Sequence, residues 1–206
     1  MDIDLETAHR CVNTNVFGTL NVTRAVAKHM AKRGKGKIVN VGSVVGYTST
    51  PWAGMKLTEY FTIYLFFYLF FFLTPGIYAL SKAAVHSMSD TLRIELKPFG
   101  IQVVIVAPGA ITSNFGNAGA KLVSVPEAKF IIARATASQG PGSTPTDVFA
   151  THVTKKVLKP VSPNYITFGA TSWIFVVLYY LPSFVKDFFF YKRFGLNHIK
   201  TNKQQD

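Results

Sequence analysis

Apolar side chains recur at helical spacing in the first part of the chain and predict one long amphipathic helix. Residues 5–31 place Leu5, Val12 and further apolar residues about one turn apart, up to the helix breaker Gly34. Two runs of β-branched residues, KIVNV at 37–41 and IQVVIV at 101–106, indicate buried parallel strands. The segment 79–96 between them is rich in helix formers and is followed by Pro98 and Gly100. This alternation predicts an α/β fold with a doubly wound parallel sheet.

The second half of the chain continues this alternation and then becomes strongly apolar. Residues 145–158 predict a helix with Thr144 as its N-cap, and residues 165–168 indicate a last strand. We therefore expect an α/β domain over residues 1–170 and a hydrophobic, then basic, membrane-associating segment over residues 171–206.

The apolar run of this last segment is too short to cross a bilayer. Residues 173–181 are interrupted by Pro182, whereas a spanning helix needs roughly 20 apolar residues. Docking on an anionic membrane surface fits better, because basic residues follow the run: Lys186, Lys192, Arg193, Lys200 and Lys203. A solvated basic tail and an ordinary hydrophobic lid or core helix are the alternatives.

One segment, residues 55–76, breaks the pattern between the first predicted strand and the helix 79–96. It is an almost unbroken run of Phe, Leu, Tyr and Ile, too short to span a membrane and too apolar for a surface loop. These residues have T-rich codons, and the ends of the segment can be encoded by strings that resemble intron boundaries. Our hypothesis is that 55–76 is an aberrant insertion, a translated retained intron, whose removal joins Gly54 to Ile77 in frame.

The strongest chemical signal is the pair Tyr78 and Lys82 in the sequence YALSK. Four residues apart on a helix, the two side chains lie on one face, about 6 Å apart along the axis. An ordinary phenol titrates near 10, and a neighbouring ammonium favours the phenolate. The pair is therefore a candidate acid/base, although a Y-x-x-x-K match alone also occurs by chance in helices.

The surrounding motifs give this pair a context, because a strand ending in Gly-Ser43 lies before it and a strand ending in Ala-Pro108-Gly109 lies after it. In this order the motifs resemble the short-chain dehydrogenase/reductase family from Leu5 to about residue 115, and removing 55–76 restores the family spacing between Ser43 and Tyr78. The resemblance implies a Rossmann-like sheet with Tyr78 donating a proton to a carbonyl, Ser43 bonding that oxygen and Lys82 tuning Tyr78 and holding the nicotinamide ribose.

Five further residues receive roles from the same resemblance. Asn15 in NVFG matches the family's active-site Asn, which positions a water next to the lysine; its alternative is a polar residue bonding within the helix. Pro108, Gly109, Ile111 and Ser113 match the loop that meets the cofactor. Ser43 has the alternative of a turn or cap serine.

The chain departs from the family at its beginning. The Gly-rich turn that binds the pyrophosphate is absent, as are the residues that select NAD or NADP, so we expect an N-terminally truncated chain whose sheet lacks its first strands. Such a product is predicted to have little or no reductase activity by itself.

The end of the chain, NYITFGATSWIFVVLYYLPSFVKDFFFYKRFGL, is similar to that of NADPH-dependent 1-acyldihydroxyacetone phosphate reductases and their plant relatives. This implies NADPH as cofactor and reduction of a lipid-linked ketone in phosphatidic acid biosynthesis, on the cytosolic face of the endoplasmic reticulum or on lipid droplets. A sterol or retinoid dehydrogenase, or a non-enzymatic truncated isoform, are the alternative functions.

Composition narrows the partners. The net charge of +12 would indicate a nucleic-acid partner if the basic residues clustered among aromatics, but they are spread along the sequence, so no nucleic acid is expected. A single cysteine, Cys11, and the lack of a zinc-type Cys/His spacing predict a reducing compartment and no metal. The remaining partners that we expect are a membrane surface, a small-molecule lipid substrate and a second copy in a homo-oligomer.

Overall fold

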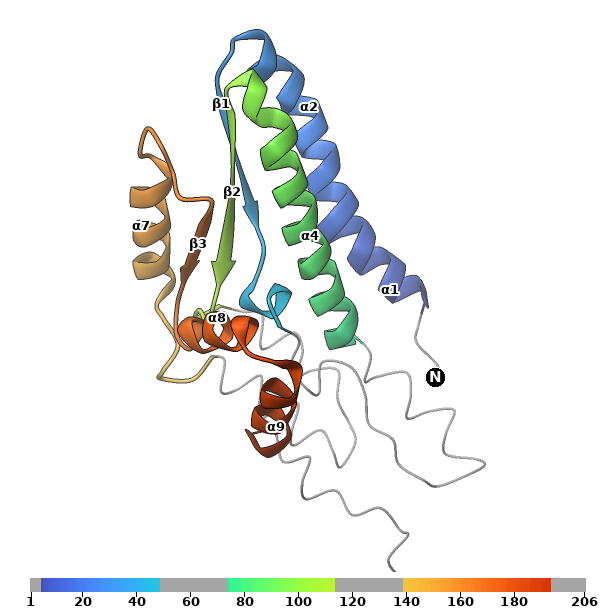
Figure 1. Cartoon of the computed structure of the whole chain (residues 1–206), viewed down its shortest axis with the longest axis vertical. Coiled ribbons are helices and arrows are strands. Elements are labelled where there is room, and N and C mark those ends of the chain that lie inside the picture. The colour runs from blue at the N-terminus through green and yellow to red at the C-terminus, as the bar shows by residue number, and fades with distance from the viewer. Residues whose placement is uncertain (1–4, 49–73, 114–138, 194–206) are drawn as a thin grey trace, which may run out of the picture.

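The computed structural model describes residues 5–48, 74–113 and 139–193, which form a parallel sheet with helices on both faces (Figure 1). Its elements in chain order are α1 (Leu5–Val12), the π-helix η1 (Asn13–Phe17), α2 (Gly18–Lys32), β1 (Gly36–Val41), the 3-10 turn η2 (Val44–Gly46), α4 (Thr74–Leu96), the 3-10 turn η3 (Lys97–Phe99), β2 (Ile101–Pro108), α7 (Thr146–Val157), β3 (Tyr165–Phe168), α8 (Ser172–Tyr180) and α9 (Ser183–Arg193).

The sheet has the order β1-β2-β3, and both pairings are parallel. The register places Ile38 beside Val103 and Val106 beside Ile166, and every strand ends at the same edge. Strands that run parallel with helices between them are the doubly wound arrangement, so the predicted Rossmann-like α/β fold is confirmed.

The two faces of the sheet are covered by different helices, because successive residues of a strand point to opposite sides. On one face, Ile38, Ile101 and Val103 pack against apolar residues of α2 and α4. On the other face, Val104, Val106 and Ile166 pack against α7 through Phe149, Val153 and Val157. The strand β2 is the centre of the core, because its residues in these two clusters are only 1 to 2 % exposed.

The strand β1 lies at the edge of this sheet, and its α7-side face is open. Val39 and Val41 pair in register with Val104 and Val106, but they are 37 % and 57 % exposed. This part of the chain therefore presents apolar side chains that its own described residues do not cover.

The predicted elements are confirmed, with differences at their ends. The helix 5–31 is continuous but contains the π turn Asn13–Phe17, and the helix expected from residue 79 begins at Thr74. Three residues of the predicted insertion, 74–76, thus form the first turn of α4, while residues 55–73 lie outside the described residues.

The predicted N-cap of α7 is wrong. Pro145 occupies the cap position, and no side chain caps the helix. Thr144 instead extends the pairing beyond β2, since its N–H donates to Ala110 O at 3.0 Å and its O accepts from Thr112 N at 2.9 Å. Its Oγ1 accepts from Ala170 N at 2.9 Å.

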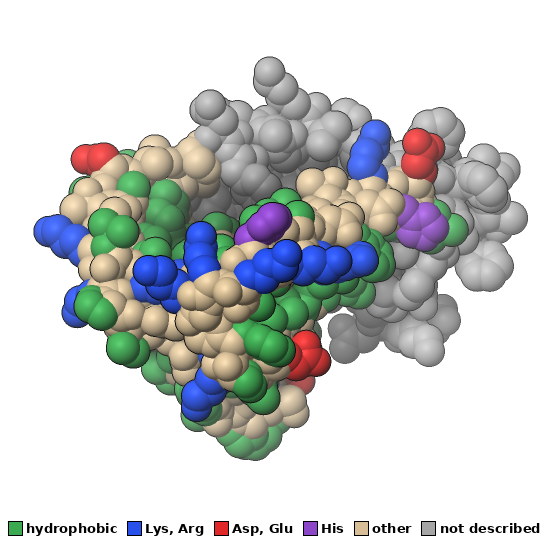
Figure 2. All heavy atoms as spheres, turned by 90° about the horizontal axis from the view of Figure 1, so that it is seen from above, with side chains coloured by type: hydrophobic (Ala, Val, Ile, Leu, Met, Phe, Trp, Pro, Cys, Tyr) green, Lys and Arg blue, Asp and Glu red, His purple; other side chains and the backbone are tan. Residues whose placement is uncertain are grey.

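Basic side chains that are scattered in the sequence gather at the end of the molecule where α2, η3 and α7 end (Figure 2). These ends carry a partial negative charge and unpaired carbonyls, which cations stabilise. Lys37 shows the effect directly, because its Nζ donates to Val157 O at 2.7 Å and to Lys159 O at 2.6 Å. Much of the positive charge at this end thus has a structural explanation.

The helices α8 and α9 lie near the opposite end, close to where the strands finish (Figure 1). Leu178 is buried and the rings of Phe175 and Phe190 lie 6.2 Å apart, which holds α8 against α9. Six aromatic residues of these two helices are exposed, and we call them the α8–α9 aromatic surface: Trp173, Tyr179, Tyr180, Phe184, Phe188 and Tyr191. Within the described ranges, no helix has the length and apolarity required to cross a membrane.

Candidate active site

The candidate residues lie on elements that come together where β1 and β2 end. Ser43 follows the last residues of β1, Pro108 ends β2, and the first half of α4, with Tyr78 and Lys82, lies beside the same edge. In open parallel sheets, ligands bind outside the carboxyl ends of the strands, so the fold places the motifs where a site is expected.

Tyr78 and Lys82 lie on one face of α4, as their spacing predicts. Lys82 Nζ is 5.6 Å from the centroid of the Tyr78 ring, and it donates a hydrogen bond to Val41 O at 3.0 Å. The ammonium is thus turned towards the end of β1 and is partly buried. This burial lowers the pKa of Lys82, and the nearby Cys11 opposes the shift. A partly desolvated cation beside a phenol favours the phenolate, which is what a tyrosine acid/base requires.

Ser43 opens the 3-10 turn η2 with an extended backbone. Its Oγ accepts a bond from Val45 N at 3.4 Å, so the serine does cap a turn, the alternative that the sequence left open. A hydroxyl that accepts one bond still has its proton to donate, and the cap therefore does not exclude a bond to a substrate oxygen. The backbone N of Ser43 donates to His86 Nε2 at 3.3 Å.

Asn15 lies in the π turn η1 and points at α4. Its Nδ2 donates to Ser81 Oγ at 2.9 Å and lies 3.6 Å from Cys11 Sγ. Ser81 immediately precedes Lys82, so Asn15 is brought to the lysine's neighbour and does not bond only within its own helix. Single π turns are frequent at functional sites because they redirect one side chain.

The loop after β2 is held by the segment after β3. Gly109 N donates to Phe168 O at 2.9 Å, and a Cβ on Gly109 would lie 2.5 Å from Ala170 O, so only glycine fits. Ser113 N donates to Gln139 Oε1 at 2.7 Å. The side chain of Ile111 reaches towards Gly169, where a Cβ would meet its Cδ1 at 2.6 Å. These contacts hold in place the loop beside the candidate site that contains Pro108, Gly109, Ile111 and Ser113. The contacts of these residues with a cofactor stay a prediction.

The sequence analysis missed residues that support this site. His86 and Ser81 hold Ser43 and Asn15, and the Tyr47 ring packs against His86 with the centroids 4.9 Å apart. For His86 a signal existed, because it lies one helical turn after Lys82 and two turns after Tyr78, on the same face of α4.

A family model described as short chain dehydrogenase matches residues 1–56 and 72–121, about half of the chain. The match stops and resumes around residues 57–71, which fall within the predicted insertion 55–76. The origin of that segment as a retained intron stays a prediction.

Curated relatives resemble parts of the chain. An oxidoreductase of Bacillus subtilis, YusZ, is 34% identical over 61% of this chain and 37% of its own length. A 3-ketodihydrosphingosine reductase of Bacteroides thetaiotaomicron is 33% identical over 50% of this chain and 30% of its own length. The NADPH-dependent 1-acyldihydroxyacetone phosphate reductase of Saccharomyces cerevisiae is 24% identical over 93% of this chain and 59% of its own length. The chain thus spans about a third to three fifths of these relatives.

Solved structures share the fold at low sequence identity. A short-chain dehydrogenase from Streptomyces avermitilis superposes with a TM-score of 0.61 at 21% identity, over 93% of this chain and 63% of that chain. A short chain dehydrogenase from Burkholderia cenocepacia in complex with NADP gives a TM-score of 0.59 at 19% identity, over 91% and 60%.

Proposed function

The chain belongs to the short chain dehydrogenase family, and from this we propose that it carries the proton-transfer half of a carbonyl reductase, with Tyr78 as proton donor. The observation that carries the proposal is the position of the Lys82 ammonium, 5.6 Å from the Tyr78 ring and bonded to the end of β1. Tyr78 gives its proton to the carbonyl oxygen of the substrate, and Ser43 donates a hydrogen bond to the same oxygen.

NADPH is the proposed cofactor, and when bound it supplies the hydride. An ammonium has three donors, and Val41 O takes one of those of Lys82, which leaves donors for the ribose hydroxyls. The residues present therefore fit the nicotinamide ribose, with Asn15 steadying the helix face beside Lys82 and the 108–113 loop next to the ring. The sequence contains no Gly-rich turn for the pyrophosphate, so this fit concerns only one end of the cofactor.

The proposed substrate is a ketone on a lipid, of the 1-acyldihydroxyacetone phosphate kind. Two relatives support this class by their names, since one reduces an acylated dihydroxyacetone phosphate and the other a ketosphingoid base. The α8–α9 aromatic surface, which lies towards the same end of the fold as the candidate site, is a further support. A sterol or retinoid would use the same catalytic residues.

We further propose that the α8–α9 aromatic surface docks on a membrane, on the cytosolic face of the endoplasmic reticulum or on lipid droplets. Phe184 and Phe188 are 71% and 62% exposed, and Lys192 Nζ lies 4.6 Å from the centroid of the Phe188 ring. Exposed rings with adjacent cations are what an anionic interface binds. The variant F184S/F188S should release the chain from phosphatidylserine vesicles in a flotation assay, whereas unchanged flotation would contradict this docking.

Turnover of NADPH with an acylated dihydroxyacetone phosphate tests the reductase. The assay uses the chain itself and the chain preceded by a dinucleotide-binding unit from a relative, each with its Tyr78→Phe variant as control. Reduction that Tyr78→Phe lowers on the order of a hundred-fold or more supports the proposal. Reduction that survives this change refutes the role of Tyr78, and NADPH binding without any reduction favours a non-enzymatic isoform.

A further inference from the structure

The main chain at Ser43 is held by a side chain, not by strand pairing. The ladder between β1 and β2 continues as far as Gly42, whose N donates to Val106 O at 2.8 Å. The next N–H, that of Ser43, donates to Nε2 of His86 on α4. This bond therefore links the main chain of the serine to α4, two residues after Val41, whose O accepts from Lys82 of the same helix.

Two glycines on either side of Ser43 make room for this ring. A Cβ on Gly42 would lie 2.1 Å from His86 Nε2, and one on Gly46 would lie 3.0 Å from Nε2. The distance at Gly42 is incompatible with a side chain and the one at Gly46 is tight, so the Gly-Ser-Val-Val-Gly loop is shaped around the ring that it contacts.

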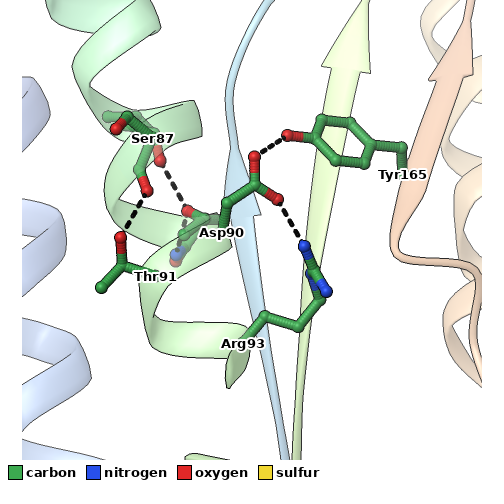
Figure 3. Close-up of polar contacts among 8 residues, drawn as sticks. Ser87, Asp90, Thr91, Arg93 and Tyr165 are labelled. Carbon is green, nitrogen blue, oxygen red and sulfur yellow. Dashed lines mark hydrogen bonds and ion pairs between the residues drawn. The ribbon is translucent and has the colours of Figure 1, made fainter. Parts of the chain in front are cut away.

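Two further rings fix the imidazole in this slot. The Tyr47 ring meets His86 edge-on at 4.9 Å, and the Tyr165 ring does so at 5.9 Å. Tyr47 Oη forms a 2.7 Å hydrogen bond with Thr167 Oγ1, and Tyr165 Oη donates to Asp90 Oδ2 at 2.5 Å. Figure 3 shows Asp90 on α4 between Tyr165 and Arg93, and the Arg93 guanidinium donates to Asp90 Oδ1 at 3.0 Å. The ring is thus held from α4, β3 and the segment after η2.

We propose that His86 is a positioning residue that sets the place of Ser43 through the Ser43 N–H to Nε2 bond, and that only its neutral form does so. The proposal rests on the role of Ser43 in the proposed function. A proton on Nε2 removes the lone pair that accepts the bond, and the Ser43 N–H would then face another N–H. The main chain of Ser43 would lose this bond to α4, which carries Tyr78 and Lys82.

The groups that face His86 favour this neutral form at physiological pH. The pKa of His86 is lowered to about 4, mainly by burial; the Asp90 carboxylate opposes this shift and the Lys82 ammonium contributes to it. Arg93 pairs with Asp90 and weakens that opposition. Tyr47 and Tyr165 stay uncharged, since burial raises the pKa of each phenol above its ordinary value.

The first test reads the contact itself by NMR at pH 7 on the whole chain with 15N-labelled histidine and serine. We expect His86 to carry its proton on Nδ1, and the Ser43 amide resonance to move in His86→Leu but stay near its wild-type position in His86→Gln, whose Oε1 replaces the acceptor. Exposed His29 on α2 supplies the control His29→Gln. A protonated Nε2, or a Ser43 amide that ignores both His86 variants, overturns the proposal.

The second test measures carbonyl reduction as kcat and KM on the chain preceded by a dinucleotide-binding unit from a relative, because the chain alone is predicted to have little or no activity. His86→Leu should lower kcat on the order of ten-fold or more, and His86→Gln should restore most of it. In the wild type, kcat should fall at acidic pH as His86 takes up a proton, and His86→Gln should not show this fall. A kcat equal in both variants, at matched folded fractions, overturns the proposal. If neither the chain nor this fusion reduces the carbonyl, the proposed function fails while the NMR test still decides whether His86 positions Ser43.

Discussion

Acidification from pH 7 to pH 5 should destabilise the folded chain through His86. Burial lowers the pKa of this imidazole from 6.5 to about 4 in the folded protein, whereas the unfolded chain keeps the ordinary value. As the pH falls, the unfolded state therefore binds the proton first. The contribution of His86 to stability is complete above pH 6.5 and is lost progressively between pH 6.5 and pH 4.

The size of the effect follows from these two values. Proton linkage gives a loss of about 2 kcal/mol at pH 5 relative to pH 7. Because the ring keeps some contact with solvent, we expect a loss between about 1 and 2 kcal/mol. Such a change is a large fraction of the stability of a small domain.

Urea unfolding followed by far-UV circular dichroism at pH 7 and pH 5 measures this loss. Other titrating groups contribute to the raw pH dependence, but they are common to the wild type and to His86→Gln, so the difference between the two chains isolates the imidazole. His29→Gln, on the exposed side of α2, should follow the wild type. An equal loss of stability in wild type and His86→Gln would refute the reasoning.

Three other substitutions test the packing around the site. Gly42→Ala places a methyl group 2.1 Å from His86 Nε2 and should lower the free energy of unfolding in urea by about 1–3 kcal/mol. Adding His86→Ala should recover part of that loss, whereas additive effects of the two substitutions would contradict the contact. Lys37→Met removes two hydrogen bonds to carbonyls at the end of α7 and should lower the stability by about 1 kcal/mol, measured by thermal unfolding. An unchanged midpoint would show that solvent replaces these two bonds. Ile166→Ala leaves a cavity at a position that is 0 % exposed and should lower the free energy of unfolding by about 2–5 kcal/mol. The control Val161→Ala, at 80 % exposure, should have a small effect, and similar losses at both positions would place the core elsewhere.

The sequence was sufficient to predict the fold where the pattern of side chains is local. The run 101–106 is apolar on both faces because helices cover both faces of the sheet at β2, and the helix 79–96 was limited by Pro98 and Gly100. The run 37–41 was also expected to be buried, but its α7-side face is open, with Val39 and Val41 exposed. The start of α4 was not predicted, because residues 55–76 were interpreted as an insertion, although a proline in the first turn is a signal for the start of a helix. Thr144 failed as an N-cap because its backbone pairs beyond β2, a contact between distant segments that leaves no local pattern.

The candidate site was predicted as far as its residues belong to motifs. Tyr78 and Lys82 are four residues apart, and helix geometry alone places them on one face. His86, Tyr47 and Tyr165 come from three different segments, and only the closed fold brings their rings together. Ser43 could be identified from its place after a strand, but the group that holds its backbone could not, since that group is 43 positions away.

The open side of β1 has a practical consequence for anyone handling this chain. A parallel edge strand with Val39 and Val41 turned outwards can pair with, or pack against, any extended apolar segment it encounters. We therefore expect its behaviour in solution to depend on protein concentration, and light scattering across a dilution series is the first measurement to make before a rate or an affinity is interpreted.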